Sequence, residues 1–373
     1  MHDLVFQAGR VVCPRTGRDG PGEVGVDGDR IAAVGENLEG AKRIELPDAI
    51  LLPGLIDLHA HPGCGGMVFY AVEPDEHMMP NGVTTVLSQG DAGADNFAAY
   101  LDSTIRSSRT RVLMALNLSR KGELARGAFA NPDDADIVAC VATATAHPEH
   151  IWGISVNTSR NACGDTDPRL IAQRGVEAAE RAGLPLLFGM RCPEDWPLAE
   201  QLELLRPGDV VTYCFRRHPH CIVDFKKRTV FPAICEARGR GVLFDVGHGM
   251  GSFDFEVAEI AIADGFPPDT ISTDQQRRHL ETQTEHSLPH VMAKLQAAGM
   301  PEPEIFKATT SRPAEILRLE TELGTLTPGA CADLVAFKKV GKCRLTDVEG
   351  AERPGPRWEV ALVMRAGRLS LDD

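Results

Sequence analysis

The segment LLPGLIDLHAHPG, residues 51–63, joins an apolar run to two histidines. Alternation along an extended strand places His59 and His61 on the same side of the chain. Two imidazoles on one side can bind one cation, and neutral imidazole is a common zinc ligand. A surface strand that ends in two polar residues would also explain a bare His-x-His. The buried-type strand before the histidines and the glycine-rich exit after them, residues 62–66, favour a metal site.

Beyond this segment, short apolar strands alternate with amphipathic helices, which is typical of parallel βα units. We expect strands near residues 55–59, 84–89, 111–118, 151–157, 185–191, 209–215, 242–247 and 270–274. We expect helices near residues 95–107, 133–146, 168–182, 195–205, 230–239, 252–264 and 285–298. Eight parallel strands with helices between them close into a cylinder. The predicted class is therefore α/β, with a (β/α)8 TIM-like barrel.

The two ends of the chain show a different pattern. Short alternating runs, separated by glycine and aspartate turns, occupy residues 2–8, 24–34 and 43–46, and similar runs return at 332–337 and 358–371. Such runs are typical of small antiparallel sheets. We predict that residues 1–52 and 322–373 together form a small β-sandwich domain, and that residues 53–321 form the barrel.

Charge and composition narrow the class of protein. The 373 residues include 39 Lys and Arg against 53 Asp and Glu, a net charge of −14, which argues against binding to nucleic acid. The ten cysteines have no paired metal or disulfide spacing and read as reduced thiols, which predicts a cytoplasmic location. No run approaches the roughly 18 apolar residues of a membrane helix. We expect a soluble enzyme acting on a small-molecule substrate.

The reactive groups of such barrels lie at the carboxyl ends of the strands. Strand one ends with His59 and His61, and the predicted eighth strand, TISTDQ, ends with Asp274. Asp274 would complete a His, His, Asp cation site and could take a proton from a bound water. It could instead cap the segment that follows it.

Seven segments of the chain form a longer pattern. They are LLPGLIDLHAH (51–61), NGVTTV (81–86), DAGADNF (91–97), FDVGHGMGSF (244–253), PDTISTD (268–274), SRPAEIL (311–317) and GTLTPGACADLVAF (324–337). In this order they resemble the amidohydrolase superfamily, and most of all its dihydroorotase-like deacetylases. The resemblance implies a barrel with a β-sandwich made from both chain ends, hydrolysis of amide, ester or cyclic imide bonds by metal-bound hydroxide, and a homodimer.

The chain departs from that family at three strand ends. A typical two-metal member has a carboxylated lysine near the end of strand four and one histidine at the end of each of strands five and six. Here no lysine occurs between residues 121 and 226, and no histidine between residues 150 and 218. Ser155, Gly189 and Tyr213 stand at the equivalent positions. A carbamate-bridged metal pair is therefore excluded, and the prediction is one divalent ion, zinc, bound by His59, His61 and Asp274.

Several side chains could fill the gap that these replacements leave. Tyr213 could bind the metal or donate a hydrogen bond to an oxyanion, and otherwise would be a half-buried aromatic. His248, between two glycines at the end of strand seven, is predicted to face the substrate. Further candidates, each with a structural alternative, are Cys64, Cys192, Cys214, His218 and His220 as ligands, and Arg160 and Arg191 for a substrate carboxylate.

Three functions remain in competition at this point. The first is a metal-dependent hydrolase of a small acylated or ring substrate, in which Asp274 binds the ion and moves the proton, and Tyr213 or His248 polarises the carbonyl. The second is a repurposed barrel that uses the same cation for non-hydrolytic chemistry, such as a lyase, decarboxylase or isomerase reaction. The third is a catalytically silent scaffold.

Overall fold

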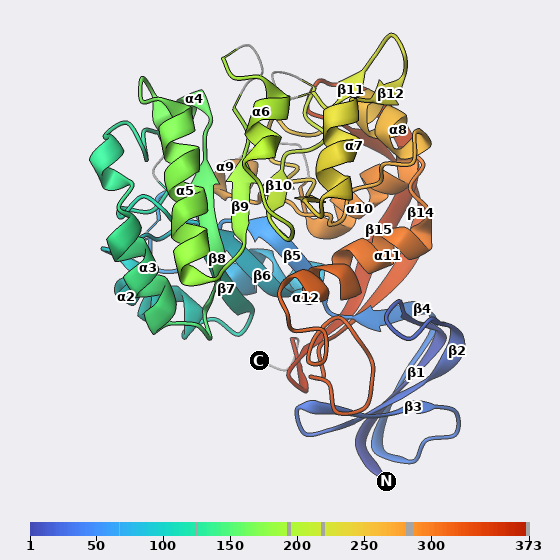
Figure 1. Ribbon diagram of the computed structural model, residues 1–373. Helices are drawn as coiled ribbons and strands as arrows, with labels where there is room; N and C mark the ends of the chain where they lie inside the picture. Colours follow the sequence, from blue (N-terminus) through green and yellow to red (C-terminus); the bar gives the residue numbers. More distant parts are fainter. Residues whose placement is uncertain (67, 124–125, 192–194, 218–220, 281–285, 371–373) are drawn as a thin grey trace.

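The computed structural model describes residues 1–373 except 67, 124–125, 192–194, 218–220, 281–285 and 371–373. Seven parallel strands in the described part form the curved wall of a barrel, and each pairs with the next along the chain (Figure 1). They are β5 (Leu55–Ala60), β6 (Val83–Gln89), β7 (Arg111–Asn117), β8 (Ile151–Asn157), β9 (Leu186–Gly189), β10 (Val210–Thr212) and β13 (Leu243–Phe244). All seven lie within or overlap the segments predicted as strands.

Residues 270–275 take the eighth position in the wall. Thr270 pairs in parallel with Asp245, just beyond β13, and Gln275 pairs in parallel with Ala60 at the end of β5. Backbone hydrogen bonds continue this pairing on both sides. The segment therefore connects the last strand to the first, and the predicted (β/α)8 TIM-like barrel is confirmed.

The helices between the strands cover the outside of the barrel (Figure 1). The longer ones are α3 (Ile137–Ala146), α5 (Pro168–Ala182), α6 (Leu198–Glu203), α7 (Pro232–Gly239), α8 (Phe255–Ala263), α10 (Leu288–Ala297), α11 (Glu302–Thr309) and α12 (Ser311–Ile316). Asp136, Asp167 and Asp254 cap α3, α5 and α8, where each carboxylate accepts a backbone N–H of the first turn. Gly183 ends α5 in the left-handed conformation that glycine adopts without strain.

Shorter elements lie in the loops. They are α1 (Pro74–His77), η1 (Met79–Asn81), α2 (Phe97–Tyr100), the π-turn η2 (Leu101–Ile105), η3 (Pro132–Asp134), α4 (Arg160–Cys163), α9 (Arg277–Leu280) and the hairpin β11 (Val223–Asp224) and β12 (Thr229–Val230). The predicted helix at 95–107 is thus α2 followed by a wider turn. Its position is right, but its regularity is lower than the pattern suggests.

Strands from the two chain ends form one mixed sheet beside the barrel, in the order β16-β15-β14-β4-β1-β2-β3 (Figure 1). The strands are β1 (His2–Cys13), β2 (Arg18–Asp27), β3 (Arg30–Gly35), β4 (Gly40–Pro53), β14 (Leu334–Thr346), β15 (Glu352–Arg365) and β16 (Arg368–Leu369). The antiparallel pair β4 and β14 joins the two ends. A β domain built from both ends is confirmed, and the exact boundaries at residues 52 and 322 stay a prediction.

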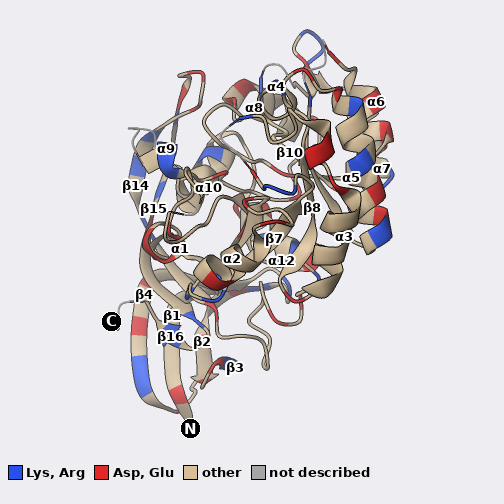
Figure 2. Cartoon of the chain, turned by 90° about the vertical axis from the view of Figure 1, so that its left-hand side faces the viewer, with Lys and Arg blue, Asp and Glu red and all other residues tan. Residues whose placement is uncertain are grey.

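Apolar side chains fill the barrel and the layer beneath its helices. Phe188, Phe215 and Phe244 are fully buried there. Acidic and basic residues both occur on outer helices such as α5 and α7 (Figure 2). Among the described residues, no helix combines the length and the apolar character needed to cross a bilayer.

Candidate metal centre

The three predicted ligands meet at the mouth of the barrel, where its first and last strands adjoin. His59 and His61 lie on and just after β5, Asp274 lies in the segment that closes the barrel, and all three side chains are buried. Nε2 of His61 is 3.0 Å from Oδ1 of Asp274, and Nε2 of His59 is 3.5 Å from the same oxygen. Two atoms bound to one tetrahedral zinc lie about 3.3 Å apart. The side chains thus present two nitrogens and one oxygen at a spacing that suits a shared cation.

A buried hydrogen-bond chain orients His59. Its Nδ1 is 2.7 Å from Oγ1 of Thr212, and that hydroxyl donates to Oδ2 of Asp245 at 3.0 Å. Because the hydroxyl proton points to the carboxylate, the oxygen accepts the Nδ1 proton of His59. Asp245 also accepts the hydroxyls of Thr270 and Ser272, at 2.6 Å each. The Nε2 lone pair of His59 is thereby left facing Asp274, as metal binding requires.

Asp91, in the loop after β6, orients His61. Its Oδ1 is 2.8 Å from Nδ1 of His61, and its Oδ2 accepts the hydroxyl of Ser88 at 2.5 Å. A carboxylate on the remote nitrogen of a ligating histidine is the usual support of a zinc ligand. Both imidazoles therefore offer Nε2 toward the same point.

The backbone is strained on two sides of this point. Asp274 has a φ of 50° and Tyr213 a φ of 70°, a left-handed region that residues other than glycine rarely adopt. Such strain costs about 1–3 kcal/mol per residue and persists where the surrounding structure enforces it. Both residues border the three ligands, so the strain coincides with the site.

Two glycines allow the ligands to approach the loop after β13. Gly247 has a φ of 49°, and a Cβ there would lie 2.2 Å from Oγ1 of Thr212. Gly249 has a φ of 47°, and a Cβ there would lie 2.4 Å from Oδ2 of Asp274. The glycines of the DVGHG segment therefore make room for the ligands and their supports, rather than bringing His248 closer to another group.

The chemistry of these residues fits a divalent cation. Oδ1 of Asp274 is buried, lies 3.0 Å from Nε2 of His61, and has no hydrogen-bond partner among the residues that the structure describes. A buried carboxylate oxygen with no donor needs a positive partner, since an unsatisfied buried acceptor costs about 1–3 kcal/mol. A cation held by both imidazoles and this oxygen would supply that partner.

The pKa values support the same fit. Burial lowers the pKa of His59, but the nearby carboxylates of Asp245 and Asp274 outweigh it and raise that pKa to about 9. Burial also lowers the pKa of His61, while the nearby carboxylates of Asp91 and Asp274 raise it to about 10. The centre therefore attracts positive charge strongly, and a bound divalent ion would replace the imidazole protons.

The ends of β8, β9 and β10 carry the replacements that the sequence predicts. Ser155 is buried on β8, where Nε2 of Gln89 donates to its Oγ at 3.4 Å. Gly189 ends β9 against Asn157, and a Cβ there would lie 3.1 Å from the side chain of Asn157. The strand register is as predicted, so β8 supplies no lysine for a carbamate.

Tyr213, directly after β10, lies beside the ligands. Its hydroxyl oxygen is 3.5 Å from Nε2 of His59, and the two rings meet edge to face at 5.1 Å. Burial raises the pKa of Tyr213 well above 10, which keeps the phenol protonated and able to donate. This position is compatible with the predicted role as a hydrogen-bond donor.

His248 is fully buried, and both of its ring nitrogens contact protein groups. Nδ1 is 2.8 Å from the carbonyl oxygen of Gly249, Nε2 is 2.9 Å from Nζ of Lys294, and the ring stacks on Phe253. Burial lowers the pKa of His248 well below 6.5, so neutral Nε2 accepts the lysine proton. This geometry favours a structural role over the predicted contact with substrate.

The remaining candidates have other partners or lie outside the described residues. Arg160 and Arg191 both pair with Asp195, Cys64 contacts Ser108, and burial raises the pKa of the Cys214 thiol well above 9. Cys192, His218 and His220 lie outside the described residues.

Four residues that the sequence pattern does not single out lie at this site. They are Asp91, Thr212 and Asp245, which support the histidines, and Glu123, whose half-buried side chain is close enough to His61 and Asp274 for their charges to act on it. Asp91 and Asp245 follow strands, so the strand-end rule could have found them. Thr212 and Glu123 carried no signal of their own.

The chain is similar in sequence to known proteins over most of its length. A model of the Amidohydrolase family matches residues 251–369, which include Asp274. A deacetylase of Enterococcus faecalis is 32% identical over 359 residues, covering 94% of this chain and 94% of that protein. A deacetylase of Agrobacterium fabrum is 32% identical over 338 residues, covering 89% of this chain and 80% of that protein.

Solved structures give the same relationship. An adenine deaminase superposes with a TM-score of 0.88 at 30% identity, covering 99% of both chains. A dihydroorotase superposes with a TM-score of 0.87 at 29% identity, covering 99% of this chain and 98% of that one. By sequence and fold, the chain belongs to the amidohydrolase superfamily, as a hydrolase related to its deacetylases.

Proposed function

We propose that this protein is a metal-dependent hydrolase that uses one divalent ion, zinc, to cleave an amide, ester or cyclic imide bond of a small acylated or ring substrate. The observation that carries the proposal is the convergence of His59 Nε2, His61 Nε2 and Asp274 Oδ1, with the other nitrogen of each ring held by protein. Two imidazoles and a carboxylate are a common catalytic zinc set. Zinc fits because it accepts nitrogen and oxygen ligands equally well.

The roles of the residues follow from their positions. A divalent ion supplies, when bound, a Lewis acid that polarises a carbonyl and lowers the pKa of water to around 7. Asp274 has a second carboxylate oxygen available to accept a proton from the attacking water. Tyr213, kept protonated by burial, is within reach of the same space and can donate to the oxygen on which negative charge develops.

The names of the relatives support a substrate from which a small acyl group is removed. Two proteins named deacetylases match over most of this chain, which favours an acetyl-sized group as the part that is removed. The proposal extends to a small-molecule substrate, a homodimer and a cytoplasmic location, and excludes nucleic acid and membrane as partners. These four points rest on composition and family resemblance.

Metal analysis combined with an activity screen tests the proposal. The protein is produced in metal-supplemented medium, its metal content is measured by plasma mass spectrometry, and acetyl esters, acetyl amides and hydantoin-like rings are assayed. We expect about one divalent ion per chain, in line with a three-ligand site, and hydrolysis of at least one class. Fewer than about 0.2 equivalents of metal would remove the basis of the proposal and favour a silent scaffold. Full metal occupancy without any hydrolysis would favour non-hydrolytic chemistry.

A further inference from the structure

Glu123 lies in the turn after β7, and two interlocked loops fix its position. Its backbone N–H donates to the carbonyl oxygen of Gly90 at 2.7 Å. A Cβ on Gly122 would lie 2.6 Å from the carbonyl oxygen of Asp91, and a Cβ on Gly93 would lie 1.9 Å from that of Ser119. The turn is therefore packed backbone to backbone against the loop that holds Asp91, the partner of His61. The chain uses small residues to bring Glu123 to the metal centre.

The carboxyl group of Glu123 has an unused acceptor. Its Oε2 is buried and has no hydrogen-bond partner among the residues that the structure describes. The charges of His61, Asp91 and Asp274 act on this carboxyl from nearby. Glu123 is not part of the group whose ligand atoms lie within 4.8 Å of one another. It therefore stands beside the cation position without belonging to it.

Tyr70 offers the complementary group. Its hydroxyl is buried without a hydrogen-bond partner in the described structure, and its ring meets that of His61 edge to face at 4.9 Å. Burial raises the pKa of Tyr70 well above 10, so the hydroxyl keeps its proton. The wall around the centre thus carries one unsatisfied acceptor and one unsatisfied donor, and unsatisfied buried groups of this kind commonly mark a ligand site.

We propose that Glu123 determines the substrate class by accepting the N–H of a secondary amide, so that the natural substrate is an N-acyl amine rather than an ester. This inference rests on the proposed function. A secondary amide has one donor and one acceptor, which match Glu123 and the phenols of Tyr70 or Tyr213. An ester has no donor for Glu123. A substrate carboxylate at this position would meet a like charge.

The reaction balances with water as the only co-reactant. The O–H of water adds to the acyl carbon as the C–N bond breaks, and the other proton of water goes to nitrogen. The leaving group is then an amine, which still has an N–H for Glu123 to accept. A buried carboxylate oxygen without a hydrogen-bond donor lowers the stability of the folded protein, and a substrate N–H would supply that donor. Functional sites commonly retain such destabilising groups.

A matched pair of probes tests the inference in the zinc-loaded protein. The probes are N-benzylacetamide and benzyl acetate, which differ only in that the ester has an oxygen in place of the amide N–H. The variant is Glu123→Gln, which keeps the shape and removes the charge, and the control is Glu203→Gln at the exposed end of α6. We expect Glu123→Gln to lower kcat/KM for the amide about 10- to 100-fold, the usual range for losing a hydrogen bond to a charged group, and to leave the ester within about 3-fold. The control should change neither.

Two further measurements separate this role from a structural one or a ligand role. Zinc content and Tm of Glu123→Gln should equal or exceed those of the unmodified protein; a loss of either would assign Glu123 to folding or to the ion and overturn the inference. Tyr70→Phe, the second variant, should lower kcat/KM for amide and ester by similar factors, because both carry the carbonyl. An equal effect of Glu123→Gln on both probes, or no effect, would also overturn it.

The inference can fail independently of the proposed function. If neither probe is hydrolysed, the proposed function loses support, and calorimetric binding of N-benzylacetamide to the zinc-loaded protein decides the role of Glu123. We then expect Glu123→Gln to weaken binding of the amide at least about 10-fold. Equal affinity in both proteins, or no binding of the amide, would refute the role of Glu123.

Discussion

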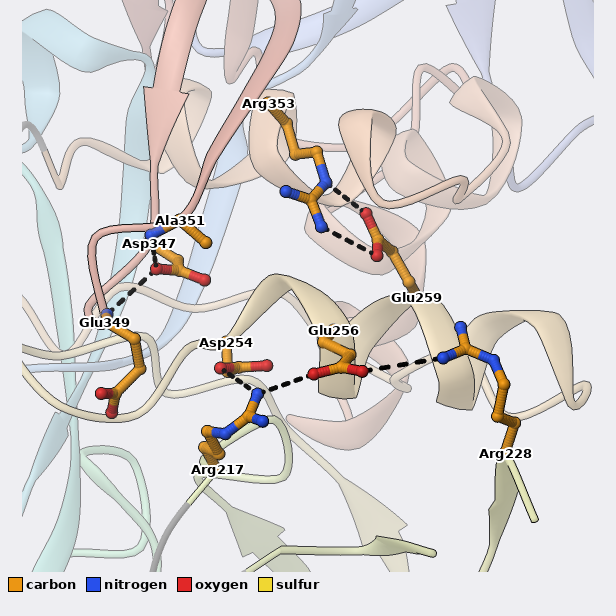
Figure 3. Close-up of a pocket in the computed structure, with 9 residues that line it drawn as sticks. All are labelled: Arg217, Arg228, Asp254, Glu256, Glu259, Asp347, Glu349, Ala351 and Arg353. Atoms are coloured by element: carbon orange, nitrogen blue, oxygen red, sulfur yellow. Dashed lines mark hydrogen bonds and ion pairs between the residues drawn. The ribbon is translucent and has the colours of Figure 1, made fainter. Parts of the chain in front are cut away.

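Two clusters of charged side chains in the described part of the molecule differ in burial and in the pairing of their charges. The first is the candidate metal centre at the barrel mouth. The second, here the charged pocket, is a surface pocket of about 310 Å³ between α8, the β14–β15 turn and neighbouring loops (Figure 3). It is lined by Arg217, Arg228, Asp254, Glu256, Glu259, Asp347, Glu349, Ala351 and Arg353.

In the charged pocket, arginines pair with carboxylates, and water reaches most of these side chains. Arg217 contacts Asp254 and Glu256, and Arg353 contacts Glu259 through two nitrogens. The side chains of Arg353 and Glu259 are 34% and 28% exposed. At the candidate metal centre, His59 and Asp245 are fully buried, and an oxygen of Asp274 has no hydrogen-bond donor among the described residues. Paired charges that contact water are therefore typical of a protein surface. Buried charges that lack hydrogen-bond partners indicate a ligand-binding site instead.

Removing a ligand should have the largest effect. His61→Ala deletes one of three protein ligands and leaves Asp274 with less positive support. We expect zinc affinity, measured by calorimetry, to fall at least about 100-fold, more than the 10- to 100-fold typical for loss of a supporting residue. Unchanged zinc affinity would mean that zinc binds elsewhere. The buried cluster at the barrel mouth would then not be a metal site.

Disturbing the backbone next to a ligand should have the next largest effect. Gly249→Ala places a methyl group where a Cβ would lie 2.4 Å from Oδ2 of Asp274, at a φ of 47°. We expect zinc affinity to fall about 10- to 100-fold and the free energy of unfolding to fall by about 1–3 kcal/mol. Gly251→Ala is the matched control, because the nearest atom to a Cβ there is 4.0 Å away. Equal behaviour of the two variants would contradict the close approach.

Breaking the support of His59 should have a smaller effect. Thr212→Val preserves shape but leaves Nδ1 of His59 and Oδ2 of Asp245 without the hydroxyl between them. We expect urea unfolding to show a loss of about 1–3 kcal/mol, the usual cost of an unsatisfied buried group, together with weaker zinc binding. Thr212→Ser restores the hydroxyl and should recover most of the zinc affinity. A serine variant as impaired as the valine variant would assign the effect to packing.

The fold and the candidate ligands could be predicted from the sequence for different reasons. Strands β5 to β10 and β13 follow apolar runs whose period is local, so they could be located to within a few residues. The closing segment was predicted as a strand at 270–274, although its pairing consists of bridges rather than a long ladder. The candidate ligands His59, His61 and Asp274 could be selected because the strand-end rule applies to any such barrel, and the structure brings them together.

The supporting residues could not be assigned to their partners from the sequence. His59 and Thr212 are 153 residues apart, and His61 and Asp91 are 30 apart, so each contact depends on the closed barrel. The glycines on both sides of His248 make room for Thr212 and Asp274, two residues that are distant from them in the sequence. A sequence motif shows that backbone space is needed, but not which neighbour needs it.

The smallest effect should come from the charged pocket. Arg353→Met keeps the stem of the side chain, which packs near Phe255, and removes the charge that pairs with Glu259. In a double-mutant cycle with Glu259→Gln, we expect a coupling energy of less than about 1 kcal/mol, because exposed ion pairs gain little over hydration. The coupling should shrink further at about 1 M salt, where screening acts within about 3 Å, and zinc affinity should not change. A coupling above about 2 kcal/mol would show that the pair is shielded from water, and weaker zinc binding would show that this pocket is linked to the barrel mouth.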